Sequence, residues 1–118
     1  MQRPRRVIID LLCLVVFVAI GRSTHDHGVA LTGMLRTLWP FVVGLGVSWA
    51  ALVRRHHSGA SLADSALIVV VTVALGMVLR VIAGQGTAVA FIIVALAFLS
   101  LTIGGWRLVV YGWRRWRS

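Results

Sequence analysis

Four long apolar segments occupy most of this 118-residue chain, and arginine, histidine or glycine residues bound each of them. The segments are Val7–Gly21, Val29–Val53, Ser65–Ala83 and Thr87–Val110. A helix needs about 20 mainly apolar residues to cross a bilayer, and three of the segments approach or exceed that length. With 59% of its residues apolar, a soluble domain of this size would expose too much apolar surface. The sequence therefore predicts an all-α integral membrane protein.

The distribution of charge predicts how the chain lies in the membrane. Twelve arginines outweigh three aspartates, which leaves a net charge of +9. Arginines precede the first segment, follow the second and close the chain, so they fall on alternate connections. Because basic residues favour the cytoplasmic side, this pattern predicts a multi-pass protein of the cell (plasma) membrane with both termini in the cytoplasm. Topology thus explains the positive charge, and we do not expect nucleic acid as a partner.

Short connections predict that successive helices are antiparallel neighbours in a single domain, an up-down bundle of four transmembrane helices. We predict helices over residues 7–22, 30–53, 62–83 and 87–111, followed by a basic tail over residues 112–118. The first segment is the weakest, because it contains Asp10 and its unbroken apolar run starts only after that residue. A cleaved signal peptide is the alternative, which the carboxylate and the three further spans disfavour.

Small residues four positions apart favour close contact between helices in lipid. The second, third and fourth segments each contain such a pair, namely Gly44 and Ser48, Thr72 and Gly76, and Ser100 and Gly104. Arg36 and Arg80 continue the first two of these rows. We therefore expect both arginines to face protein rather than lipid.

Asp10 and Arg107 are predicted to lie at similar depths near the cytoplasmic side. Asp10 comes about one turn into the first helix and Arg107 lies near the end of the fourth. An ion pair is the simplest way to hold both charges in a membrane. Three interpretations follow: a structural clasp, a proton-linked or ion-linked carboxylate at Asp10, or an Arg107 side chain that extends alone to the interface.

A second group of charges lies at the opposite face, where the topology rule does not favour arginines. Arg22, His25, Arg36 and Arg80 are the candidate ligand-binding residues of this group. One interpretation is a bound anion, because guanidinium groups match the oxygens of a lipid headgroup, a small organic acid or an inorganic anion. The alternative is that the arginines extend outward and pair with Asp26 or helix-end carbonyls. His25 and His27 lack a third ligand, so we predict no metal site.

Several short motifs follow one another in a characteristic order. They are Asp10 and Gly21-Arg22-Ser23-Thr24-His25, then Pro40-Phe41, Gly44 and Trp49, then Gly76-Met77-Val78-Leu79-Arg80, and finally Phe91 and Gly105-Trp106-Arg107. Together they resemble the DUF3054 family over nearly the whole chain. The resemblance implies a small bacterial or archaeal membrane protein of unassigned function. It favours Asp10, Arg22, His25, Arg80 and Arg107 as functional positions.

The sequence contains no enzymatic motif, so we expect no catalytic residue, no cofactor and no enzyme activity. We expect a structural or accessory membrane subunit with a charge-locked bundle. Its partners would be membrane lipid with anionic headgroups, and a membrane protein or a second copy of the chain. The alternative is a small transporter or channel that binds an anion or protonatable solute at the outer arginine and histidine cluster. Small multidrug exporters and fluoride channels are similar in architecture alone, which does not establish function.

Overall fold

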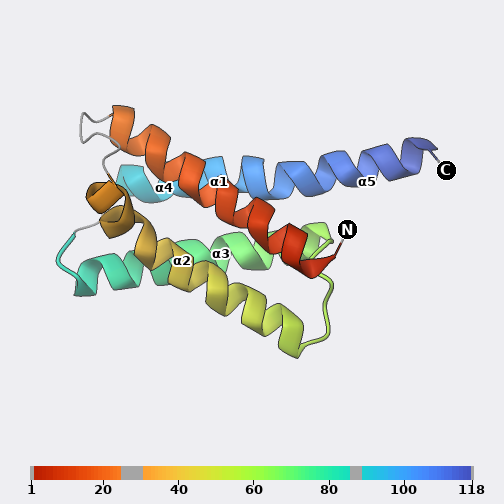
Figure 1. The fold of residues 1–118 in the computed structure, drawn as a ribbon, viewed down its shortest axis with the longest axis horizontal. Helices are drawn as coiled ribbons and strands as arrows, with labels where there is room; N and C mark the ends of the chain where they lie inside the picture. The colour runs from red at the N-terminus through yellow and green to blue at the C-terminus, as the bar shows by residue number, and fades with distance from the viewer. Residues whose placement is uncertain (1, 25–30, 86–88, 118) are drawn as a thin grey trace.

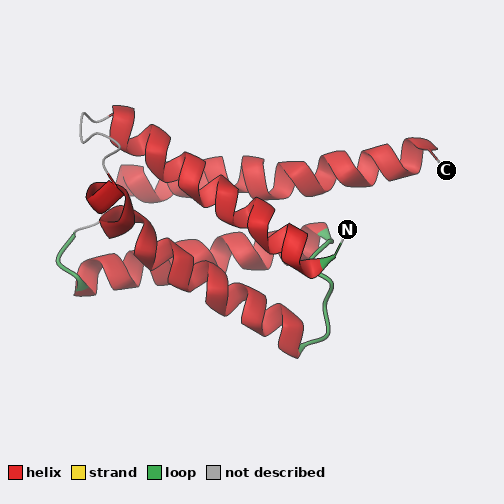
Figure 2. Ribbon diagram, in the orientation of Figure 1, coloured by secondary structure: helices red, strands yellow, loops and turns green. Residues whose placement is uncertain are grey.

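A computed structural model describes residues 2–24, 31–85 and 89–117, and every regular element in these ranges is helical (Figures 1 and 2). In chain order the elements are α1 (Arg3–Thr24), α2 (Leu31–Arg54), α3 (Leu62–Ile82), α4 (Val89–Leu99), η1 (Ser100–Gly104) and α5 (Gly105–Arg117). The element η1 is a π-helical turn that joins α4 to α5 in one continuous helix. The described part of the chain therefore consists of four long helices and their connections.

Three of these helices are long and apolar enough to cross a membrane. They are Thr32–Arg54, Leu62–Ile82 and Val89–Arg117. α1 is not among them, and it carries several charges within its 22 residues, namely Arg3, Arg5, Arg6, Asp10 and Arg22. Length and composition thus support three of the four predicted spans.

The predicted boundaries differ from the observed ones at both ends of the chain. α1 begins at Arg3, before the predicted start at residue 7. α5 continues to Arg117, so the predicted basic tail is helical over its described residues. Arginine is a good helix former, and the side chains of α5 also contact one another one turn apart. Arg115 donates a hydrogen bond to the Tyr111 hydroxyl at 3.1 Å, which links successive turns of this extension.

The helix ends gather at two ends of the molecule. In Figure 1 the start of α1, the loop between α2 and α3, and the end of α5 lie toward the right, and we call this the terminal end. The end of α1, the start of α2, the end of α3 and the start of α4 lie toward the left, at the opposite end. α2 and α3 form the most extensive contact between helices.

Aromatic side chains fill the core between α1, α2 and α4. The Phe17 ring of α1 lies 5.9 Å from Phe41 of α2, measured between ring centroids. It also lies 5.8 Å from Phe91 and 5.5 Å from Phe98, both in α4. Phe17 and Phe41 are buried, so these rings hold three helices together.

Small residues bring α2 and α3 into close contact, as predicted. A Cβ atom added to Gly44 would lie 2.8 Å from the Thr72 carbonyl oxygen, and one added to Gly76 would lie 2.7 Å from the Phe41 ring. The prediction is wrong for Ser100 and Gly104. Ser100 is exposed, and a Cβ atom on Gly104 would meet nothing within 4 Å. Both residues lie in η1, whose wider turn breaks the assumed spacing.

Candidate functional site

The carboxylate of Asp10 in α1 is completely buried at the terminal end of the molecule. Its Oδ1 atom accepts hydrogen bonds from Arg107 Nη1 at 2.9 Å and from Trp106 Nε1 at 2.9 Å. Its Oδ2 atom accepts from Arg107 Nη2 at 2.8 Å and from Trp49 Nε1 at 3.0 Å. We call these four residues the buried clasp. Since each carboxylate oxygen accepts two hydrogen bonds, the acceptor capacity of Asp10 is filled.

Arg107 of α5 supplies the counter-charge and binds two backbone carbonyls as well. Its side chain is 1% exposed. Besides the paired bonds to Asp10, Arg107 Nε donates to the Gly59 carbonyl at 2.8 Å and Nη1 donates to the Ile103 carbonyl at 3.0 Å. The guanidinium carbon also lies 4.3 Å from the centroid of the Trp106 ring. The structure thus brings together Asp10 and Arg107, the pair expected from the sequence.

The π-helical turn η1 determines which way Arg107 faces. The buried residues of the α4–η1–α5 helix follow one another at intervals of four, at Ala95, Leu99, Ile103 and Arg107. In a regular α-helix each such step turns the row by about 40°, so the row would drift away from the interface. The wider turn of η1 reduces this drift. Arg107 therefore reaches Asp10 on the same side as the apolar residues above it.

The loop between α2 and α3 closes the clasp from the terminal end. Gly59 has φ of +79°, in the left-handed region that favours glycine. A Cβ atom there would overlap the Trp49 ring. Arg3 of α1 donates to the His57 carbonyl at 2.9 Å, and His57 Nδ1 lies 2.8 Å from Asp64 Oδ1. These contacts hold the loop against α1 and α3.

A capping box holds the start of α3. The Ser61 hydroxyl accepts from the Asp64 amide at 3.0 Å, and Asp64 Oδ2 accepts from the Ser61 amide at 3.4 Å. Asp64 therefore has two structural roles, because the same carboxylate caps the helix and contacts His57.

The clasp strongly constrains how the helices pack, because both of its charged side chains are buried away from water. Attraction inside a protein offsets this desolvation only when the geometry is good and the remaining donors and acceptors are paired. Here the carboxylate and guanidinium groups are paired in a two-bond arrangement, and four further hydrogen bonds surround them. The clasp joins α1, α2, α5 and the loop at one point.

Two of the outer arginines, Arg22 and Arg80, each have a neutral partner at the opposite end of the molecule. Arg22 Nη1 donates to the Thr37 hydroxyl at 2.9 Å. Arg80 Nη1 donates to Gln85 Oε1 at 3.1 Å, and Gln85 Nε2 donates to the Arg36 carbonyl at 3.0 Å. Arg80 thus reaches α2 through Gln85.

The other two residues of the predicted outer group are Arg36 and His25. The Arg36 side chain is exposed, so the expectation that it faces protein is wrong; only its backbone carbonyl is used. The buried part of the small-residue row ends at Pro40. Arg36, one turn earlier in the helix, lies outside that buried part. His25 lies outside the described residues. Ligand binding by Arg22, His25, Arg36 and Arg80 stays a prediction.

Sequence reasoning identified the charges of the clasp but not its other members. Trp49 and Trp106 appeared only as motif positions, and Gly59 did not appear. A tryptophan in an apolar segment gives no sign of which acceptor its ring N–H will meet. In the described ranges, no group of three or more histidine, cysteine, aspartate and glutamate side chains could hold a metal ion.

The geometry defines a helical protein in which three helices have the length and composition of membrane spans and two charges pair inside the bundle. The chain belongs to the family described as protein of unknown function (DUF3054), whose pattern matches residues 7–110. The match confirms the resemblance seen in the sequence, and it includes all four clasp residues. No curated protein and no solved structure matches the chain.

Proposed function

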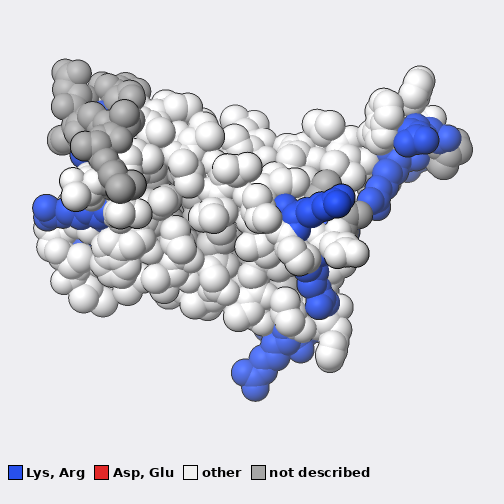
Figure 3. Space-filling view, viewed as in Figure 1, with Lys and Arg blue, Asp and Glu red and all other residues white. Residues whose placement is uncertain are grey.

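We propose that this chain is a multi-pass protein of the cell membrane and that its four helices form an antiparallel up-down bundle. Its apolar outer surface supports this proposal, because Val70, Val78 and Leu101 on the α3 and α4–η1–α5 helices are all more than half exposed. Figure 3 shows arginine side chains toward the two ends of the molecule, with uncharged residues between them. Lipid is the solvent that such a surface requires.

α1 is proposed as the fourth span although its composition is the least apolar. Ile8, Leu12, Val16 and Ile20 follow one another at intervals of four, and each is about half exposed. They form an apolar row that faces away from the core. The charge of Asp10 on the other side of the helix is neutralised by Arg107. α1 can therefore present an apolar face to lipid while it holds a carboxylate inside the bundle.

The terminal end is proposed to face the cytoplasm, which places both chain termini there. Arginines gather at this end, namely Arg3, Arg5, Arg6, Arg54, Arg55, Arg114, Arg115 and Arg117. Basic residues near the ends of spans favour the cytoplasmic side. A basic cytoplasmic end would attract the anionic lipids of that leaflet.

For its biochemical role, we propose a structural or accessory membrane subunit rather than a transporter or an enzyme. The filled hydrogen-bonding capacity of Asp10 carries this proposal. A carboxylate that carries protons or ions must exchange partners, whereas both oxygens of Asp10 are bonded to arginine and tryptophan. The exposed apolar helix faces would pack against a membrane protein partner or a second copy of this chain.

The polar residues between the two ends of the molecule also favour a structural role. The Ser48 hydroxyl donates to the Gly44 carbonyl at 2.8 Å and lies 3.4 Å from the Thr72 hydroxyl. The Thr102 hydroxyl donates to the Phe98 carbonyl at 2.9 Å. These groups bond within or between neighbouring helices, as expected for residues that stabilise helix contacts.

A flux assay with purified protein in liposomes tests this role. We expect no movement of protons or of a panel of inorganic and organic anions beyond that of empty liposomes. Arg80→Ala should lower only the yield of folded protein, and Arg55→Ala, an exposed arginine at the terminal end, is the matched control. A flux that Arg80→Ala abolishes while helix content and stability stay normal would contradict the proposal and support a carrier.

A further inference from the structure

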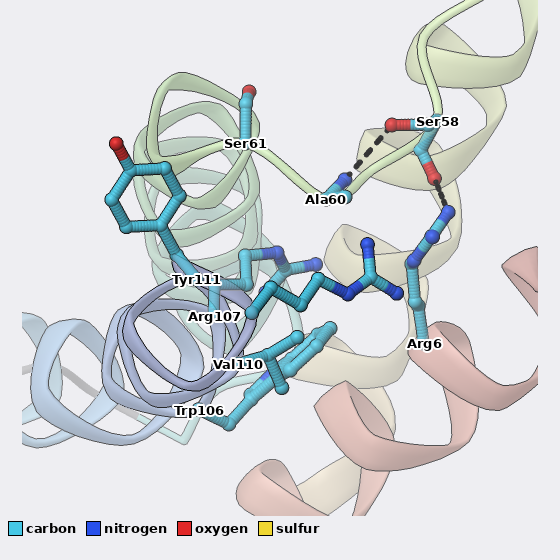
Figure 4. Close-up of a pocket in the computed structure, with 9 residues that line it drawn as sticks. Arg6, Ser58, Ala60, Ser61, Trp106, Arg107, Val110 and Tyr111 are labelled. Atoms are coloured by element: carbon cyan, nitrogen blue, oxygen red, sulfur yellow. Dashed lines mark hydrogen bonds between the residues drawn. The ribbon is translucent and has the colours of Figure 1, made fainter. Parts of the chain in front are cut away.

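A cleft of about 280 Å³ opens beside the clasp at the terminal end, between α1, the α2–α3 loop and α5. Three arginines line it, Arg6, Arg107 and Arg114, together with hydroxyl-bearing residues that include Ser61 and Tyr111. Figure 4 shows Arg6 and Arg107 approaching the cleft from different helices. Its lining contains no carboxylate residue. The charged residues that line the cleft are thus all arginines.

Arg6 is the most informative residue of this cleft. Its side chain is only 9% exposed, yet it forms no salt bridge with the described residues. Nη1 donates to the Ser58 carbonyl at 2.7 Å, and this is the only hydrogen bond of the side chain with the described part of the chain. A guanidinium group carries five N–H donors, so four remain for another acceptor. A bound anion in the cleft would accept hydrogen bonds from these donors and balance the charge.

The other two arginines of the cleft differ in how many of their N–H donors and charges are already paired. The bonds of Arg107 use four of its five N–H groups, and the remaining hydrogen is on Nη2. Arg114 is exposed and makes no hydrogen bond or salt bridge with residues in the described ranges. Asp10 neutralises one of the three positive charges through Arg107. Two positive charges therefore face the cleft without compensation from its lining.

We propose that this cleft binds a phosphate group, carried either by an anionic lipid headgroup or by a soluble phosphate ester. Guanidinium groups bind phosphate oxygens through paired, charge-assisted hydrogen bonds. The volume lies just below the range of about 300–1,000 Å³ that is usual for drug-sized ligands, so a small headgroup fits better than a large cofactor. The lipid source rests on the proposed membrane orientation, because it requires the terminal end to meet the anionic leaflet.

Tyr111 and Val110 favour the lipid source. The Val110 side chain gives the cleft an apolar wall, and the Tyr111 ring is 58% exposed at its rim. Tyrosine and tryptophan collect at the headgroup level of membranes, and Trp113 and Trp116 follow on the same helix. If Arg6 and Arg114 held the phosphate of a lipid at the headgroup level, the acyl chains of that lipid would be free to lie along the apolar surface of α5.

Binding to purified protein in neutral detergent tests the proposal. Phosphatidylglycerol and glycerol 3-phosphate are the two phosphate probes, and phosphatidylcholine is the zwitterionic control. Retained lipid is counted by native mass spectrometry, and the affinity of each probe is measured from tryptophan fluorescence, since Trp106 lines the cleft. Preference for phosphatidylglycerol alone identifies a lipid site, whereas comparable binding of glycerol 3-phosphate identifies a soluble phosphate ester.

Three single variants distinguish phosphate binding in the cleft from a general attraction of phosphate to the positive surface. Arg6→Gln and Arg114→Gln should each weaken binding of the preferred phosphate probe about tenfold, which corresponds to about 1.4 kcal/mol. Arg54→Gln is the matched control, because Arg54 is an exposed arginine at the same end that does not line the cleft. Its affinity should stay within about twofold of wild type, the scatter expected of a screened surface charge.

Two results would overturn the proposal: equal losses in all three variants, or unchanged binding in Arg114→Gln. Arg114 makes no bond within the described fold, so Arg114→Gln should fold normally. Its phosphate affinity therefore tests the proposal even if Arg6→Gln fails to fold. Alkaline carbonate extraction of cell membranes tests membrane integration separately. A chain released by carbonate would contradict the proposed function, while the glycerol 3-phosphate measurement would still decide whether the cleft binds phosphate.

Discussion

Asp10 shows how one carboxylate in an apolar helix can constrain a whole bundle. It is fully buried, and its four hydrogen bonds come from α2 and α5. Because leaving a charge unpaired in this environment is costly, alternative packings that separate Asp10 from Arg107 are disfavoured. The clasp therefore favours the packing in which Asp10 meets Arg107 over packings that separate them.

Replacement of Asp10 by asparagine should strongly destabilise the protein. The neutral amide of Asp10→Asn would leave the buried guanidinium group of Arg107 without its counter-charge, and breaking a buried pair in this way costs about 3–5 kcal/mol. The free energy of unfolding can be measured by titration with sodium dodecyl sulfate in mixed micelles. Arg55→Gln, an exposed site outside the clasp, should change it by less than about 0.5 kcal/mol.

The double variant Asp10→Leu with Arg107→Leu completes this experiment. It removes both charges, so no unpaired ion remains in the core, and much of the stability lost in Asp10→Asn should return. A double variant that is as unstable as the single one would show that the loss comes from packing around the clasp rather than from the unpaired charge.

The ion pair was predictable at this scale, whereas its surroundings were not. The rise of a helix per residue is enough to place Asp10 and Arg107 at a similar depth. The ring N–H groups of Trp49 and Trp106 point to Asp10 only because α2 and α5 have particular rotations about their axes. Sequence periodicity does not specify those rotations to the accuracy of a hydrogen bond.

At the scale of helices, the packing depends on the close approach of α2 to α3 and on the π turn between α4 and α5. Gly44 and Gly76 let α2 and α3 come together, and their spacing was visible in the sequence. The π turn from Ser100 to Gly104 was not visible, because one additional residue in a turn leaves the composition of the helix unchanged. That turn decides which residues of α5 face the core.

Gly44→Ala should weaken the contact between α2 and α3. The added Cβ atom would lie 2.8 Å from the Thr72 carbonyl oxygen and 2.9 Å from its Cα atom, and backbone atoms cannot move aside as a flexible side chain can. Such overpacking costs about 1–3 kcal/mol. Unfolding in sodium dodecyl sulfate again gives the change in free energy.

Gly46→Ala on the same helix is the matched control for this substitution. A Cβ atom there meets nothing within 4 Å, so the variant should gain about 0.5–1 kcal/mol from better helix propensity. Equal effects of the two substitutions would indicate that Gly44 acts through helix propensity and not through contact with α3.

At the scale of the whole molecule, the first helix was the weakest of the spans predicted from the sequence. Its charges keep it outside the group of helices that have the composition of membrane spans. The structure nevertheless packs it against α2 and α4 and pairs its buried carboxylate. An ion pair with a distant helix is what makes the proposed insertion of α1 reasonable.

Labelling of single cysteines should place Gln2 and Ala63 on one face of the membrane and Ala83 on the other. All three side chains are exposed, and each would be replaced by cysteine in a Cys13→Ala background. A membrane-impermeant maleimide should label Ala83→Cys in intact cells, and the other two only in inside-out vesicles. Labelling of Gln2→Cys and Ala63→Cys from opposite faces would show that α1 does not cross the membrane.

Composition, apolar segment length and the placement of arginines were sufficient to determine an all-helical chain with apolar helices and charged ends, because each is a local property of the sequence. Only the tertiary structure decided that Arg107 would meet Asp10, both tryptophan N–H groups and the Gly59 carbonyl. Those contacts depend on the π turn and on the rotation of each helix, which result from packing the entire bundle at once. The arginine-lined cleft is decided in the same way, since its walls come from three segments far apart in the chain.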